Sequence, residues 1–248
     1  MEPDYTFARR PRWLVGHLVA TSAIVLFVIL GMWQLSRHQD RSELDALLES
    51  RIAAEPLSFE AAAATPIEDL ELSRVAVVGM YVPSEEVILQ ARSYNGRSGH
   101  NVITPLLTAN GEAVLVNRGW VPIDTVGPPV VDGPPPSGEV SIVGVARKTE
   151  VRGSLGPVDP AQGTLERISR VDIERLEGQV SSPLVGFYLQ LIEPSSSGEL
   201  PLTLPAPEPG GGPPHLSYAV QWFLFAGVVL VGYPLLMRST ARKRQPQD

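Results

Sequence analysis

Two long runs without charged residues limit what this chain can fold into. From Leu216 to Met237 the sequence has 22 consecutive residues with no Asp, Glu, Lys or Arg, and residues 13–33 form a second such run. At the rise of an α-helix, the 22 residues cover about 33 Å, enough to cross a bilayer core of about 30 Å. The first run is too long for the core of a cleaved signal peptide, and no Ala-x-Ala site follows it. The sequence therefore predicts two retained transmembrane helices.

The charges that flank the two runs predict how the chain crosses the membrane. Basic residues precede the first run and follow the second, at Arg9, Arg10, Arg12, Arg238, Arg242, Lys243 and Arg244. Because cytoplasmic flanks carry an excess of Lys and Arg, we expect both termini in the cytoplasm and the long intervening segment outside. Glu2 and Asp4 argue against a mitochondrial presequence, which is poor in acids. We predict a multi-pass protein of a bacterial plasma membrane.

Composition excludes several classes of site and partner. The chain has no cysteine, which rules out disulfides, thiol redox chemistry and thiolate metal sites. Its four Met residues are too scattered for a thioether copper motif, and we predict no metal site. The net charge is −7, and because the two tails together carry +4, residues 13–237 carry −11. Such an acidic segment is a poor partner for nucleic acid.

The predicted fold class is a pair of transmembrane helices that flank a mainly antiparallel β (α+β) extracytoplasmic domain. The predicted division is a cytoplasmic tail (1–12), a first transmembrane helix (13–35), the extracytoplasmic domain (36–193), a Pro/Gly-rich linker (194–214), a second transmembrane helix (215–237) and a basic cytoplasmic tail (238–248).

Local patterns predict the elements of the extracytoplasmic domain. Alternating or β-branched segments indicate strands at 73–81, 87–94, 101–108, 113–121, 140–151 and 187–192. Asn110-Gly111 is a strong signal for a hairpin between two of these strands. Leucines at helical spacing predict a helix over residues 38–54, which either continues the first span outward or turns along the membrane surface. A short helix is expected over residues 170–176.

The sequence carries no signature of an enzyme. It has no Walker loop, no dinucleotide-binding glycine pattern and no His-Glu-x-x-His. Ser98 and His100 lie close together, but the surrounding glycines are typical of a turn rather than of a nucleophile elbow. Acidic residues are dispersed, without a pair whose spacing suggests acid–base work. We therefore expect a protein that is not an enzyme.

The four histidines differ in their predicted depth in the membrane. His17 lies toward the cytoplasmic end of the first span, about 25 Å along the membrane normal from His215. His17 and His215 therefore cannot bind one metal. His38 and His215 share a depth, and they are the candidate pair if two axial imidazoles hold a haem.

The start of the second span allows two interpretations. His215, Tyr218, Trp222 and Phe225 follow a 3-4-3 spacing, so they are predicted to share one face of the helix. This stripe is either an ordinary aromatic belt at the membrane interface or the wall of a haem site, since a porphyrin needs apolar and aromatic surroundings. Spacing alone leaves both interpretations open.

Four separated motifs resemble one known family. They are Gly31-Met32-Trp33-Gln34-Leu35-Ser36-Arg37, residues 99–106 (GHNVITPL), residues 114–122 (VLVNRGWVP) and residues 214–223 (PHLSYAVQWF). In order, spacing and topology the chain resembles the Surfeit-locus family of cytochrome c oxidase assembly factors, whose yeast member is the Shy-type protein. Residues 123–200 match only by general pattern.

The resemblance implies a membrane assembly factor (chaperone) for aa-type cytochrome c oxidase that assists haem a delivery or insertion into the catalytic subunit. The family's proposed haem-binding histidine falls on His215. The Asn-Arg-Gly-Trp motif, with Asn117, Arg118 and Trp120, looks structural or partner-facing. In the first motif, Trp33 lies where aromatic rings favour the headgroup level, and Arg37 can reach phosphates.

An alternative function is a stable accessory subunit of cytochrome oxidase or of a respiratory supercomplex. Two spans and an acidic outer domain suit either role. The expected partners are the oxidase catalytic subunit, haem a synthase, a respiratory supercomplex and the lipid bilayer. A membrane-tethered hydrolase has no supporting residues and ranks last.

Overall fold

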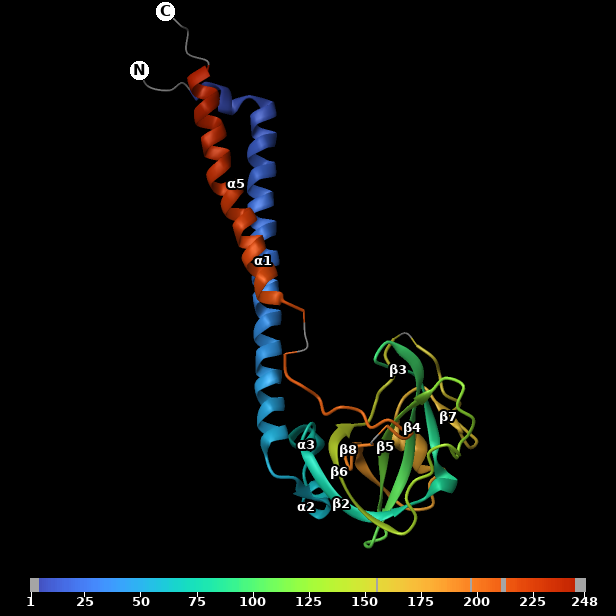
Figure 1. Ribbon diagram of the computed structural model, residues 1–248. Coiled ribbons are helices and arrows are strands. Elements are labelled where there is room, and N and C mark those ends of the chain that lie inside the picture. Colours follow the sequence, from blue (N-terminus) through green and yellow to red (C-terminus); the bar gives the residue numbers. More distant parts are fainter. Residues whose placement is uncertain (1–4, 155, 197, 211–212, 244–248) are drawn as a thin grey trace, which may run out of the picture. The chain divides into compact units, whose positions relative to one another are not determined.

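The protein consists of two compact units. One unit is built from residues 1–46 and 209–248, and the other from residues 47–208. The helices and strands of both units are labelled in Figure 1. The computed structural model describes residues 5–154, 156–196, 198–210 and 213–243.

The first unit contains a short 3-10 turn, η1 (Thr6–Arg9), most of a first long helix, whose residues 47–53 belong to the second unit, and a second long helix near the C-terminus. Helix α1 (Pro11–Ala53) contains the first apolar run and continues without interruption through the helix expected over residues 38–54. Helix α5 (His215–Lys243) contains the second run. Both helices are long and apolar enough to cross a bilayer, one near each end of the chain. Of the two alternatives for residues 38–54, the structure shows the continuation of the first helix.

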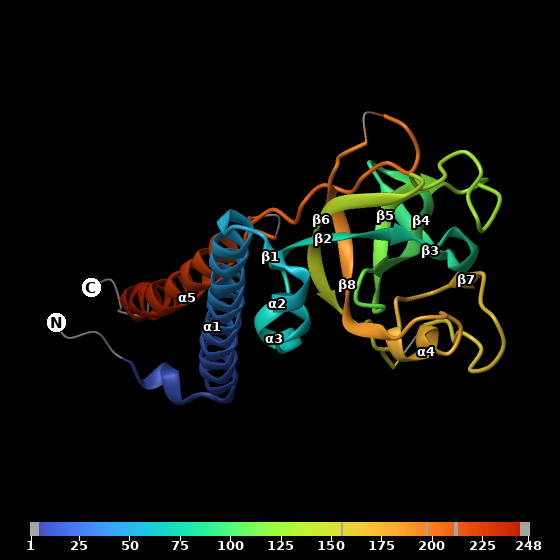
Figure 2. The ribbon, with the colours of Figure 1, turned by 90° about the horizontal axis from the view of Figure 1, so that it is seen from below.

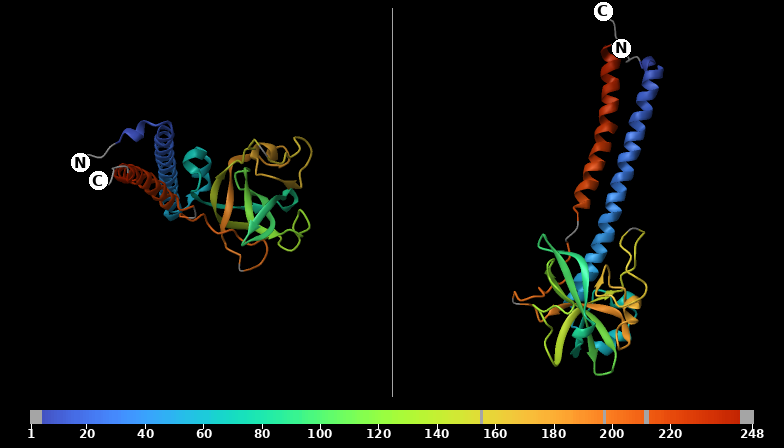
Figure 3. Two further views of the ribbon diagram at one scale, coloured as in Figure 1. Left: turned by 90° about the horizontal axis from the view of Figure 1, so that it is seen from above. Right: turned by 90° about the vertical axis from the view of Figure 1, so that its right-hand side faces the viewer.

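Helices α1 and α5 run antiparallel and pack side by side, as the views in Figures 1 and 3 show. Ala219 and Ala226 are buried at the contact, and the Phe27 ring stacks on Trp222 with centroids 5.7 Å apart. The contact positions recur every three or four residues, the period of coiled-coil packing. On α1 these positions include Trp13, His17, Ala20, Ile24, Phe27, Gly31, Gln34 and His38.

The second unit contains the strands and the short helices. Its elements after α1 are β1 (Leu57–Ser58), α2 (Phe59–Ala63), α3 (Ile67–Leu70), β2 (Arg74–Tyr81), η2 (Pro83–Glu85), β3 (Val87–Tyr94), β4 (Arg97–Thr108), β5 (Ala113–Pro122), β6 (Glu139–Lys148), β7 (Arg167–Ile168), α4 (Ile173–Glu177) and β8 (Leu184–Glu193). The six longer strands coincide with the six predicted ones to within four residues at each end.

The strands form a closed barrel. Strands β2, β6, β8, β5 and β4 pair in that order, and β4 pairs back with β2 to close the ring. Strand β3 pairs with β4 on the outside of this ring, and Figure 2 shows the strands curving around a common interior. Closure leaves few free strand edges, which protects the sheet from pairing with other chains.

The expected mainly antiparallel sheet needs correction, because the sheet is mixed. Among the described strands, three pairings are parallel, namely β1 with β2, β3 with β7 and β5 with β8. The long crossing after β6 returns the chain so that β8 enters between β6 and β5, antiparallel to the first and parallel to the second. Alternation of apolar residues marks a strand, but it does not encode which neighbour the strand takes.

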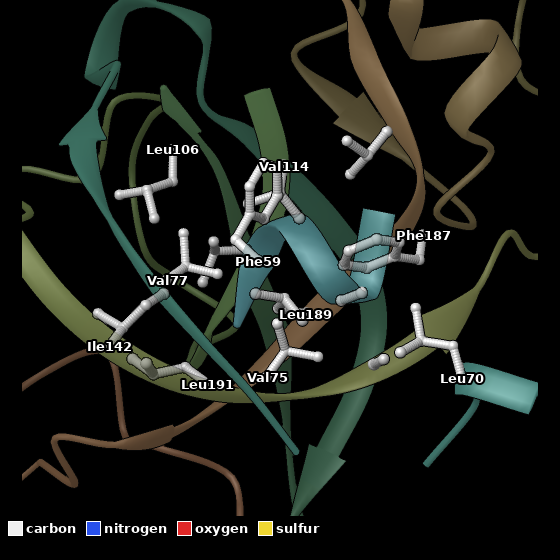
Figure 4. Close-up of a cluster of buried hydrophobic side chains, with 14 residues drawn as sticks. Phe59, Leu70, Val75, Val77, Leu106, Val114, Ile142, Phe187, Leu189 and Leu191 are labelled. Carbon is white, nitrogen blue, oxygen red and sulfur yellow. The ribbon is translucent and has the colours of Figure 1, made fainter. Parts of the chain in front are cut away.

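The barrel interior is the main apolar core of this unit. Side chains from β2, β4, β5, β6 and β8 point inward, and α2 contributes Phe59, whose ring contacts Phe187 at 6.4 Å between centroids (Figure 4). Leu70, Val75, Leu106 and Leu189 are completely buried there. Such burial is the dominant stabilising contribution to a domain of this size.

Two connections bear on the sequence predictions. The Asn110-Gly111 hairpin joins β4 to β5, and Gly111 has a positive φ of 82°, which confirms the hairpin. The early part of the segment predicted as a linker packs on the barrel. Leu202 exchanges two backbone hydrogen bonds of 2.8 Å with Trp120.

Candidate functional site

The candidate site lies where α5 begins beside α1. Residues Pro213 and Pro214 precede the helix, and Pro is well suited to the start of a helix because its φ is already helical. His215 is the first residue of α5 and is half-buried. Its Nδ1 lies 2.8 Å from Oε1 of Gln34 on α1. The site is thus a histidine at a helix start, joined across the helix pair to an amide.

This hydrogen bond determines which nitrogen of His215 can bind a ligand. The carbonyl oxygen of Gln34 only accepts, so Nδ1 of His215 carries the proton and donates it. In a neutral imidazole the other nitrogen, Nε2, then has a free lone pair. Within the described part of the chain, Nε2 has no hydrogen-bond partner. This is the arrangement typical of a histidine that binds a metal through Nε2 and is held in place through Nδ1.

The surroundings of His215 on α5 differ from the predicted stripe. The face turned to α1 carries His215, Ala219, Trp222 and Ala226, whereas Tyr218 is 46% exposed. Trp222 contacts Phe27 and Phe225, with Phe225 at an edge-on centroid distance of 5.9 Å. Helical spacing places positions 218 and 219 next to each other near one face of α5, and it does not determine which of the two faces α1. In the structure the small Ala219 packs against α1. The structure therefore brings Trp222, but not Tyr218, into the helix contact.

His38 lies on the same face of α1 as Gln34, one turn further along. The four-residue step places it about 6 Å beyond Gln34 along the helix axis. Its side chain is half-buried. Trp33 and Arg37 lie instead on the outer surface of α1, where the guanidinium of Arg37 is 5.9 Å from the Trp33 ring centroid.

The Asn-Arg-Gly-Trp motif forms a β-bulge inside the barrel unit. The register with β4 shifts here, so that Asn117 and Gly119 oppose consecutive residues and Arg118 is the extra one. The Asn117 side chain accepts a hydrogen bond from the Gly119 backbone at 3.2 Å. Gly119 has a φ of 135°, and the Leu202 carbonyl occupies the space that a Cβ would need. A glycine is therefore required at this position.

The bulge directs Arg118 into a buried ion pair with Glu86. Arg118 donates to Glu86 Oε2 at 3.0 Å and to the Gly133 carbonyl at 2.7 Å. Glu86 also accepts from Thr104 at 2.7 Å and from the Val130 backbone at 2.8 Å. Both side chains are almost completely buried, so the hydrogen bonds are needed to offset the loss of water. Arg118 is thus occupied within the domain.

Trp120 and one ring nitrogen of His100 also have hydrogen-bond partners within the domain, whereas Nδ1 of His100 is buried without one among the described residues. The Trp120 ring is buried, and its Nε1 donates to the Arg92 carbonyl at 3.3 Å. His100 is 7% exposed, and its Nε2 accepts from Arg167 at 3.3 Å. Burial lowers the pKa of His100, and the positive charge of Arg167 lowers it further. These residues of the second and third motifs therefore support the fold around the bulge.

Two residues of these networks were not singled out from the sequence. Gln34 was quoted only as part of a motif, although an amide at the end of an apolar helix needs a partner and could have been paired with His215. Glu86 lies in a turn between two strands, where an acidic residue normally indicates exposure. Only the fold reveals that it is buried under the loop containing Val130.

The sequence of this chain matches one family of known proteins. The family model described as the SURF1 family matches residues 21–227, a range that contains all four motifs. An uncharacterized SURF1-like protein of Mycobacterium tuberculosis is 27% identical over 253 residues, covering 98% of this chain and 90% of the relative.

Two eukaryotic relatives also match. A SURF1-like protein of Monosiga brevicollis is 29% identical over 84% of this chain and 82% of its own length. Human Surfeit locus protein 1 is 35% identical over 146 residues, covering 52% of this chain and 48% of the human protein. The resemblance noted in the four motifs is confirmed, and the chain belongs to the SURF1 family.

Proposed function

We propose that this chain is a membrane assembly factor for aa-type cytochrome c oxidase, without enzymatic activity, that holds haem a through His215 during its delivery to the catalytic subunit. Membership of the SURF1 family supports the proposal, because the motifs of this chain resemble those of Surfeit-locus assembly factors. The single observation that carries the haem contact is the hydrogen bond between His215 Nδ1 and Gln34.

The residues present suit an axial haem ligand. His215 offers Nε2 with a free lone pair, and imidazole is the usual protein ligand of haem iron. Phe27 and Trp222 form an aromatic stack further along the same helix contact. Bound haem a would supply an iron that such a nitrogen can bind. His215 would hold the group, and His38 is the candidate for a second imidazole.

We further propose that α1 and α5 cross a bacterial plasma membrane. Basic residues flank the outer ends of both apolar runs, which favours cytoplasmic termini and an external barrel unit. In this arrangement Gln34 and His215 lie near the outer face. The partners would be the lipid bilayer, the oxidase catalytic subunit and haem a synthase.

Purification after co-expression with haem a synthase tests the haem contact. We expect the wild-type protein in detergent to carry haem a absorbance and the His215→Ala variant to lose it. His38→Ala reports on a second ligand, since it should weaken binding only if His38 contributes. The matched control is His100→Gln, which removes an imidazole from the barrel unit and should leave haem content unchanged. A colourless wild type, or a fully coloured His215→Ala variant, would refute the proposed ligand.

Deletion of the gene tests the assembly role separately. We expect a smaller aa-type oxidase band in difference spectra of the membranes, restored by the wild-type gene and less well by His215→Ala. An unchanged band after deletion would exclude an assembly role. Stoichiometric presence of the protein in mature, active oxidase would instead indicate a permanent accessory subunit.

A further inference from the structure

Gln34 is the polar partner of His215 on α1. It is half-buried at a contact position, between Gly31, whose Cβ position would meet the Phe223 ring, and His38. An amide among apolar helix contacts is unfavourable without a hydrogen bond. Its Oε1 accepts from His215 Nδ1 at 2.8 Å. The contact therefore gives the Gln34 carbonyl oxygen a donor and fixes the proton on one nitrogen of His215.

We infer that Gln34 is a positioning residue that holds His215 in the tautomer and ring orientation needed to bind a ligand through Nε2. This inference rests on the proposed haem role of His215. Nothing in the family assignment gives Gln34 a role, and the inference comes from the contact between the two helices. Outer partners of this kind orient metal-binding histidines and keep their lone pair available.

His17 provides an internal comparison at the other end of the same helix pair. Its Nε2 lies 3.2 Å from the Ala8 carbonyl, so Nε2 donates. Its Nδ1 lies 2.8 Å from the Tyr233 hydroxyl, which donates to it in the neutral ring. His17 thus has the opposite tautomer to His215, and both of its nitrogens are used. Of these two histidines, His215 is the one whose second ring nitrogen has no hydrogen-bond partner among the residues that the structure describes.

The alternative role for Gln34 is attachment of one helix to the other. Simple attachment would be served by any hydrogen bond across the helix pair, as Tyr233 and His17 illustrate. That role predicts that loss of Gln34 changes stability without changing ligand affinity. A positioning role predicts a change in the tautomer of His215 and a loss of affinity that an acceptor at position 34 restores. The two roles are therefore distinguishable.

The first measurement is the tautomer of His215 in the ligand-free, full-length protein. Nitrogen chemical shifts of ¹⁵N-histidine-labelled protein in detergent distinguish protonated from unprotonated ring nitrogens, and His215→Ala identifies the signal. We expect the wild type to carry its proton on Nδ1. Gln34→Met, which keeps the length of the side chain but removes the acceptor, should shift the proton toward Nε2. Gln34→Glu keeps an acceptor and should retain the wild-type tautomer.

The second measurement is a titration of the same proteins with ferric protoporphyrin, followed by its absorbance. We expect Gln34→Met to lower affinity by about 10- to 100-fold, the usual loss when an outer partner of a metal ligand is removed. Gln34→Glu should restore most of it. The matched control is Gln221→Met, which removes an exposed amide from α5 and should leave both the tautomer and the affinity unchanged.

The outcomes separate this inference from the proposed function. If Gln34→Met leaves the tautomer on Nδ1, or lowers affinity no more than Gln221→Met, the positioning role is wrong while a haem role of His215 stands. If the wild type binds no porphyrin but the tautomer responds to Gln34→Met, the haem role fails while the control of His215 by Gln34 stands. A shifted tautomer with lost and restored affinity supports both.

Discussion

The buried ion pair of the barrel unit and the histidine–amide pair of the helical unit differ in how many of their polar atoms have hydrogen-bond partners. In the barrel unit, Glu86 and Arg118 are buried, and each makes several hydrogen bonds inside the domain. In the helical unit, Gln34 satisfies one nitrogen of His215 and leaves the other without a partner among the described residues. A closed network stabilises a fold, whereas a half-satisfied group retains the capacity to bind. This contrast indicates a structural role for Arg118 and Glu86, and it supports the ligand role that we propose for His215.

We expect the largest loss of stability when the buried ion pair between Arg118 and Glu86 is broken. Arg118→Met leaves the carboxylate of Glu86 buried without its partner, which should cost about 3–5 kcal/mol of unfolding free energy. For a domain of this size the midpoint of thermal unfolding should fall by on the order of 10 °C. Circular dichroism of the full-length protein in detergent measures this change.

The control for this prediction is the exposed ion pair between Arg74 and Glu193, in which the Glu193 side chain is 60% exposed. Arg74→Met should cost no more than about 1 kcal/mol. If Arg118→Met proves as mild as Arg74→Met, the closed network does not stabilise the barrel and the contrast between the two centres is lost.

The second prediction compares the packing around one glycine in each unit, Gly99 in the barrel unit and Gly31 in the helical unit. In the barrel unit, a Cβ at Gly99 would meet the Val121 carbonyl and, at 2.5 Å, the Trp120 ring. Gly99→Ala should therefore cost about 1–3 kcal/mol. In the helical unit, a Cβ at Gly31 would meet the Phe223 ring edge at 2.7 Å, but Phe223 is 37% exposed and has room to move. Gly31→Ala should be milder, because alanine also favours a helix.

Thermal unfolding of both variants measures the difference. A loss of stability in Gly31→Ala equal to that in Gly99→Ala would mean that the helix pair is packed as rigidly as the bulge. In that case the free nitrogen of His215 would lie in a site with little room to admit a ligand.

Much of the fold could be predicted from the sequence because its signals are local. Uncharged runs of helical length predicted α1 and α5, and alternation predicted the six longer strands. Strand order could not be predicted, since the parallel pairing of β5 with β8 depends on contacts between distant segments. The two-residue strands β1 and β7 are too short to show a period.

The candidate site was predicted less completely than the fold. His215 and Trp222 were identified from spacing, and the structure places both on the face of α5 that contacts α1. Gln34 was missed because pairing it with His215 requires the relative rotation of two helices, which no single helix encodes. Arg118 was expected to be structural or partner-facing, and its partner Glu86 could not be named because it lies 32 residues away in the chain.

The third prediction concerns His17 of the helical unit, whose two ring nitrogens both have hydrogen-bond partners. Tyr233→Phe removes the hydroxyl next to His17 Nδ1. Hydrogen bonds between transmembrane helices contribute about 0.6 kcal/mol on average, so we expect a small loss of stability. Ferric protoporphyrin affinity should not change, because His17 is not the proposed ligand. A clear loss of affinity would show that the two ends of the helix pair are coupled, which contradicts the contrast between His17 and His215.

The smallest effect is expected from His100 in the barrel unit. Burial and the charge of Arg167 lower the pKa of His100 below its ordinary value of 6.5. Below pH 6.5 the unfolded chain therefore binds more protons at this position than the folded chain does. The free energy of unfolding should fall as the pH drops below 6.5 and level off below the folded pKa, with no contribution at higher pH.

Carboxylates also change the stability with pH, mainly at lower pH values. Comparing the wild type with His100→Gln separates the contribution of His100 from theirs. Denaturant unfolding of wild type and variant at about pH 7.5 and 5.5 gives the difference between their pH dependences. We expect the wild type to lose more stability than the variant over this interval. A larger loss in the variant would mean that folding raises the pKa of His100. The imidazole would then be stabilised in its charged form, and burial and the charge of Arg167 would not be the dominant influences on His100 in the folded protein.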